Sequence, residues 1–135
     1  MFEFHGWAVL RWTDAAADNA VQMAAIRRAL DSVRSDFSAA EIITTGNDLT
    51  VMIVHGLRNH RMASIERLFA VVAKESPESY GLFYVRDDED ARGGEFADSF
   101  RVWRIARGEF SETNDPFLSP CVPTIEAPYD PSSDG

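Results

Sequence analysis

Two stretches of the sequence carry apolar residues on a single helical face, and this feature constrains the fold more than any other. The first stretch has apolar residues at three- and four-residue spacing, namely Met23, Ile26, Leu30, Val33 and Phe37. The second repeats the spacing at Met62, Ile65, Phe69 and Val72. A helix with one apolar face must cover another layer. Two such helices therefore predict a sheet with both helices on one of its faces.

Capping and breaking residues set the expected helix bounds. We expect the first helix from about Asp14 to Phe37, because Thr13 or Asp14 can cap its start. We expect Asn59 to cap the second helix, which should end before Pro77.

Strand patterns occupy most of the remaining chain. Residues 2–12 alternate between two faces, with Gly6 as either a bulge or a close-packing point. Residues 41–45 and 49–54 flank Gly46-Asn47-Asp48, which is a hairpin signal. Residues 81–86 and 100–107 are the fourth and fifth strands, and the prolines after Gly108 indicate that regular structure stops there.

The order β-α-β-β-α-β-β predicts an α+β fold. It is a two-layer sandwich with a mainly antiparallel sheet of about five strands and two helices on one face.

Composition favours one globular domain. The chain has 135 residues, 45% hydrophobic and 26% charged, which is enough to bury a core. We expect this domain over residues 1–126, including an ordered proline-rich arm at 115–126, with a flexible tail at 127–135. No apolar run approaches the roughly 18 residues of a membrane helix. No secretory signal is expected at the N-terminus, and a single cysteine forms no internal disulfide, so we expect a cytoplasmic protein.

The net charge of −9 is concentrated in two segments. Residues 87–98, the acidic loop, hold six acidic residues and Arg92. Residues 109–135 hold six more acidic residues and no basic one, whereas the rest of the chain is close to neutral. This distribution repels nucleic acid and suits a basic protein partner. The plain alternative is that the charge serves solubility alone.

The sequence offers no catalytic or metal-binding signature. Cys121 lies among apolar residues, which is typical of a small buried side chain, and no local motif ties it to a histidine base. His5, His55 and His60 have no ligand spacing with one another or with Cys121, so neither a metal nor a cofactor is expected. The acidic run at residues 87–90 lacks the alternating ligands of an EF-hand.

Five segments in the same order resemble the immunity protein 7 family of bacterial polymorphic toxin systems, including contact-dependent inhibition systems. The resemblance covers residue 2 to about residue 126. The segments are "EFHGWAVLR" from Glu3, "HGLRNHR" from His55, "YGLFYVRDDED" from Tyr80, "FRVWRIARGEF" from Phe100 and "DPFLSPCVPTIE" from Asp115.

The resemblance implies a protein that is not an enzyme. Such a protein binds and neutralises a cognate toxin domain, often a nuclease, in the toxin-producing bacterium. Its expected partner is a basic toxin domain, with no nucleic acid, membrane or cofactor. The family supplies no interface residues, so the toxin-binding candidates come from the charge pattern. They are Asp87, Asp88, Glu89, Asp90, Glu95, Asp98, Glu109 and Glu112.

The prolines at 116, 120 and 123 stiffen the arm and remove amide donors. We expect the arm to pack across the domain with Cys121 inward, burying apolar residues that also include Phe117, Leu118, Val122 and Ile125. Two other functional hypotheses remain at this level. One is a small-molecule-binding or regulatory α+β domain, and the other is a small hydrolase that uses Cys121.

Overall fold

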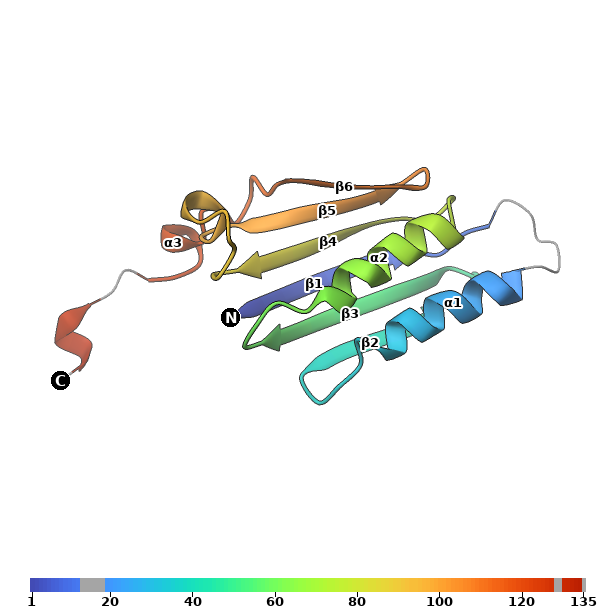
Figure 1. Cartoon of the computed structure of the whole chain (residues 1–135), viewed down its shortest axis with the longest axis horizontal. Coiled ribbons are helices and arrows are strands. Elements are labelled where there is room, and N and C mark those ends of the chain that lie inside the picture. The colour runs from blue at the N-terminus through green and yellow to red at the C-terminus, as the bar shows by residue number, and fades with distance from the viewer. Residues whose placement is uncertain (13–18, 128–129, 135) are drawn as a thin grey trace.

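The computed structural model describes residues 1–12, 19–127 and 130–134. It contains a six-stranded sheet in the order β2-β3-β1-β4-β5-β6, in which every neighbouring pair is antiparallel. The two main helices lie on the same face of this sheet (Figure 1). The predicted α+β two-layer sandwich is confirmed, with one strand more than expected.

The elements follow one another in chain order as β1 (Phe2–Val9), α1 (Asn19–Asp31), β2 (Ser38–Thr44), β3 (Thr50–Arg58), α2 (Ala63–Glu75), β4 (Tyr80–Asp87), η1 (Gly94–Phe96), β5 (Phe100–Ala106), β6 (Glu109–Asn114), α3 (Cys121–Thr124) and η2 (Pro131–Asp134). The predicted hairpin at residues 46–48 joins β2 to β3.

The core lies between the helices and the sheet, as alternation in the strands dictates. Phe2, Phe4 and Ala8 of β1 have no exposed surface, and Glu3, His5 and Trp7 point to the other face, where neither main helix lies. The buried face of α2 includes Ile65, Leu68, Phe69 and Val72, and α1 contributes Ile26 and Leu30.

Gly6 is a close-packing point. Its register with β3 and β4 is uninterrupted, so there is no bulge. Above it Phe69 and Phe83 stack with ring centroids 4.1 Å apart. A Cβ atom at Gly6 would lie 2.4 Å from Cδ2 of Phe83, so any larger residue must displace this aromatic stack.

Both helices are shorter than expected. Residues 14–18 lie outside the described part of the chain, and α1 ends at Asp31, so Phe37 is not on a helix and is 69% exposed. The Asn59 cap was also wrong, since Met62 precedes α2 and makes no side-chain cap. The reason is that β3 continues to Arg58, where it still pairs with Phe2, which places Asn59 in the connection.

The prediction that regular structure stops after Gly108 was wrong. Arg107 and Gly108 have φ of 53° and 75° and form a two-residue turn into β6, as hairpins favour. The side chain of Phe110 packs on Trp103, with ring centroids 5.4 Å apart. The other side chains of β6 are polar, which conceals the strand in the sequence.

Candidate functional site

The acidic loop connects the end of β4 to the start of β5, and several of its carboxylates build the loop itself. Oδ1 of Asp87 accepts the amide of Glu89 at 3.0 Å, and Oδ1 of Asp90 accepts the amide of Arg92 at 2.9 Å. Short acidic side chains favour such turns because they bond to the backbone two residues ahead. Gly93 and Gly94 then adopt positive φ, which glycine tolerates best.

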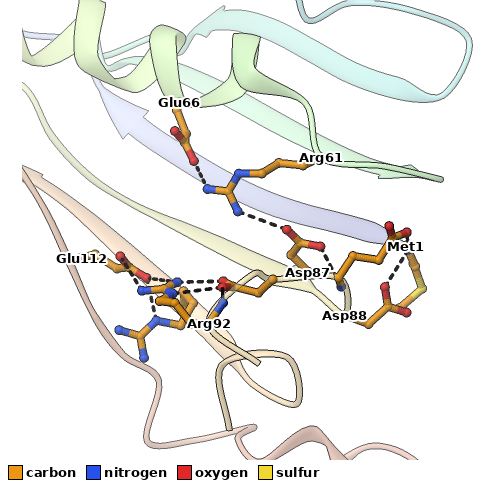
Figure 2. Close-up of polar contacts among 10 residues, drawn as sticks. Met1, Arg61, Glu66, Asp87, Asp88, Arg92 and Glu112 are labelled. Carbon is orange, nitrogen blue, oxygen red and sulfur yellow. Dashed lines mark hydrogen bonds and ion pairs between the residues drawn. The ribbon is translucent and has the colours of Figure 1, made fainter. Parts of the chain in front are cut away.

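The side chain of Asp87 points into the interior of the protein. It is 6% exposed, and Oδ2 accepts from Nη1 of Arg61 at 3.1 Å. Arg61 also pairs with Glu66 of α2, so it bridges the helix layer and the end of β4 (Figure 2). The guanidinium lies over the rings of Phe2 and Trp103.

Asp90 and Glu112 share one arginine. Arg92 donates to Glu112 at 2.8 Å (Figure 2). Arg92 also donates to Asp90 at 2.8 Å, and Arg101 donates to Glu112 at 2.7 Å. Hydrogen bonds from Arg92 hold the pKa of Asp90 at about 2. Burial opposes ionisation of Glu112, but Arg92 and Arg101 outweigh it and lower its pKa. Both carboxylates are therefore ionised, and arginines of the same protein offset their negative charge.

The negative charge that is exposed to solvent comes from fewer residues than the sequence suggested. Asp88 and Glu89 are exposed and lie 2.7 Å and 3.4 Å from the amino group of Met1, and His60 contacts Glu89 at 3.1 Å. Glu95 is exposed as well. These three carboxylates are the part of the acidic loop that faces solvent.

The structure does not gather all eight predicted residues. Asp98 is half-buried and holds the arm, since its Oδ1 accepts the amide of Val122 at 3.0 Å. Glu109 is exposed but follows the turn at the opposite end of β5, away from the acidic loop. The remaining members lie at one end of the sheet, where residues including His60, Arg61, Glu89 and Glu112 line an open hollow of about 580 Å³.

The model of one protein family, described as Immunity protein 7, matches residues 1–127 of the chain. The chain belongs to the immunity protein 7 family. No curated protein and no solved structure matches it significantly. Membership indicates an immunity protein directed against a toxin.

The C-terminal arm of this immunity protein is attached by polar contacts. Asp115 is buried and accepts the amides of Phe117 at 3.1 Å and Leu118 at 2.8 Å. Near the end of the arm, Glu126 pairs with Arg86 at 2.5 Å.

The expected apolar burial of the arm was wrong for four residues and right for one. Cys121 is fully buried, whereas the exposed residues are Phe117 at 78%, Leu118 at 47%, Val122 at 40% and Ile125 at 44%. The reason is that the turn built on Asp115 and the contacts of Asp98 direct only Cys121 inward. Burial raises the pKa of the Cys121 thiol, which disfavours the thiolate that a nucleophile requires.

Two histidines of the immunity protein meet on the sheet face that points away from α1 and α2. His5 and His55 are direct partners across β1 and β3, and their Nδ1 atoms lie 2.8 Å apart. Burial and the neighbouring His5 lower the pKa of His55. Sequence spacing missed this pair because the residues are 50 positions apart and only the strand register brings them together.

Among the residues that the structure describes, no three or more His, Cys, Asp or Glu side chains form a group that could hold a metal ion, and no helix could span a membrane.

Proposed function

We propose that this immunity protein binds the toxin domain of a cognate effector and blocks it in the cytoplasm of the bacterium that produces both. The toxin system belongs to the polymorphic class that includes contact-dependent inhibition. Family membership supports a toxin partner. The net charge of −9 supports a basic partner, and a domain that cleaves nucleic acid is basic where it holds its substrate. We therefore propose that the toxin is a nuclease.

The acidic loop is the proposed contact surface, and one observation carries this choice. Its exposed carboxylates, on Asp88, Glu89 and Glu95, are presented by a loop whose inner carboxylates are fixed by Arg61 and Arg92. A surface that is already ordered loses less conformational entropy when it binds. Negative charge that is held in place also steers a basic partner toward one docking orientation.

Inhibition then follows from position and charge. The exposed carboxylates occupy the basic groove that the toxin uses for nucleic acid, so the substrate and the immunity protein compete for one surface. Asp87, Asp90 and Glu112, which are paired with arginines, hold this surface in place and do not contact the toxin.

Growth rescue tests the proposal. The cognate toxin domain is co-expressed with the wild-type protein or with a variant in which Asp88, Glu89 and Glu95 are replaced by lysine. We expect the wild type to be pulled down with the toxin and to restore growth, and the variant to lose both.

A matched control carries the same change of charge elsewhere. Glu41, Glu78 and Glu109 are also exposed, and their replacement by lysine should leave rescue intact. Equal rescue by both variants, or loss of rescue in the control alone, would place the interface outside the acidic loop. Failure of the wild type to bind the toxin would reject the proposed function itself.

A further inference from the structure

The sheet face that points away from α1 and α2 holds two imidazoles in contact. His5 and His55 are direct cross-strand partners, with Nδ1 atoms 2.8 Å apart and ring centroids 5.0 Å apart. Both side chains reach solvent, that of His5 with 41% of its surface exposed. We propose that this pair binds a divalent transition-metal ion such as Zn²⁺, Ni²⁺ or Cu²⁺ through its two Nδ1 atoms.

Glu3 prepares His5 to act as a ligand. Its Oε2 lies 2.6 Å from Nε2 of His5. A carboxylate only accepts, so Nε2 of His5 carries the proton and donates it to Glu3, which leaves a lone pair on Nδ1. Metal-ligating histidines are commonly oriented by a carboxylate in this way.

The contact between the two rings marks the place that the metal would take. Without metal, Nδ1–H of His55 donates to the lone pair on Nδ1 of His5. When His55 instead carries its proton on Nε2, both Nδ1 atoms present lone pairs to the same point. A metal ion at that point replaces one shared hydrogen bond with two coordinate bonds.

The required movement is small. Two nitrogen ligands of a tetrahedral zinc ion, each about 2.0–2.1 Å from the metal, lie roughly 3.3 Å apart. The present separation of 2.8 Å must therefore widen by about half an ångström. The two rings can separate toward solvent, so no core packing opposes the change.

The ligand type selects the class of ion. Imidazole nitrogen suits zinc, copper and nickel, whereas magnesium and calcium prefer oxygen. The described residues bring together no group of three or more candidate ligands. The protein thus supplies two nitrogens, and water fills the other positions. This site is separate from the acidic loop and does not depend on the toxin proposal.

Calorimetric titration of the full, tag-free chain with NiCl₂ or ZnCl₂ tests the proposal. We expect one ion per chain in the wild type. His5→Gln and His55→Gln should each weaken binding more than tenfold, and MgCl₂ should show no binding at this site. His60→Gln is the control, because His60 is exposed and contacts Glu89 of the acidic loop rather than His5 or His55, and this variant should bind as the wild type does.

Glu3 is a positioning residue in this proposal, and Glu3→Gln should weaken binding by about tenfold. The nitrogen NMR signals of His5 should also show loss of the Nε2–H preference in this variant, which a purely structural role would not cause. Wild-type affinity in both His5→Gln and His55→Gln, or absence of binding in the wild type, would overturn the proposal. Binding lost only in His60→Gln would also overturn it.

Discussion

Arg61 and Asp87 tie the segment before α2 to the end of β4 through a contact of 3.1 Å, in which the carboxylate is 6% exposed and the arginine 42%. The carboxylate is therefore almost cut off from water, whereas the arginine is not. The contact therefore matters to stability more than the exposed acids beside it, although all of them belong to one run in the sequence.

Asp87→Ala should lower the free energy of unfolding by about 1–3 kcal/mol, since it removes a buried hydrogen-bonded charge. Asp88→Ala is the neighbouring control and should change it by about 0.5 kcal/mol or less. Urea unfolding at neutral pH measures both. Equal effects in the two variants would contradict the buried role of Asp87.

The Asp90–Arg92 pair should make stability depend on pH in the acid range. The pKa of Asp90 is lowered from 3.8 to about 2 in the folded protein. A lowered folded-state pKa stabilises the protein above the unfolded value, and this contribution is lost as pH falls toward the folded value. Because Arg92 is 41% exposed, we discount the contribution for solvent screening to about 1–2 kcal/mol.

Asp90→Asn should therefore be less stable than the wild type at pH 6, and roughly half of the difference should be gone by pH 3. Asp36→Asn, at an exposed position, provides the control and should show no such trend. A difference between wild type and Asp90→Asn that stays constant from pH 6 to pH 3 would count against the pair.

Gly6→Ala should disturb the packing of the aromatic core. The added Cβ would lie 2.4 Å from Phe83 and 3.0 Å from Phe69, and overpacking of this kind costs typically about 1–3 kcal/mol. Gly46→Ala has nothing within 4 Å of the new Cβ and should be nearly neutral. Thermal unfolding of the two variants gives the comparison, and equal melting temperatures would argue against tight packing at Gly6.

The acidic loop should accelerate association with the toxin. Charge steering raises the on-rate above a neutral baseline of about 10⁵–10⁶ M⁻¹s⁻¹ and weakens as salt increases. Replacing Asp88, Glu89 and Glu95 by lysine should slow association and flatten its salt dependence in stopped-flow measurements. Asp87 is left unchanged because its reversal would disturb the fold.

The variant with lysine at positions 41, 78 and 109 has the same net charge and separates local steering from a global effect. If both variants associate at one rate at every salt concentration, the acidic loop plays no special part.

The stability that the arm contributes should depend on Cys121 rather than on the exposed apolar residues of the arm. Cys121→Ala should cost about 1 kcal/mol because the side chain is fully buried, and it should leave toxin protection intact. Phe117→Ala should change stability by about 0.5 kcal/mol or less, since Phe117 is 78% exposed. Chemical unfolding and growth rescue report the two properties. A folded Cys121→Ala protein without protection would revive a chemical role for the thiol.

Periodic apolar patterns were sufficient to predict the two layers, because apolar residues at helical spacing lie on one face of a helix and that face is buried. Ile65, Phe69 and Val72 are an example. Strand β6 was missed because a polar edge strand has a single inward anchor, Phe110, and its only other signal was the Arg107-Gly108 turn. Edge strands need less apolar alternation, since less of their surface is buried.

The candidate site was harder to predict because charge in a sequence does not reveal pairing. Asp87 and Asp88 are adjacent and chemically identical, yet Asp87 is the buried last residue of β4, whereas Asp88 follows the strand and is exposed. Glu112 joins Asp90 through Arg92, and Glu112 lies on β6 whereas Asp90 and Arg92 lie in the acidic loop. The pairing of His5 with His55 depends on strand register alone.

The central position of β1 affects when the protein can become active. This strand is made before both of its neighbours, because Phe2 pairs with Arg58 on one side and Asp87 on the other. The second of these neighbours, β4, is complete only when residue 87 of 135 has been synthesised, and such distant pairings form slowly. A chain that is still being translated therefore gives no protection during most of its synthesis. A cell that relies on it must keep a finished supply before the toxin arrives.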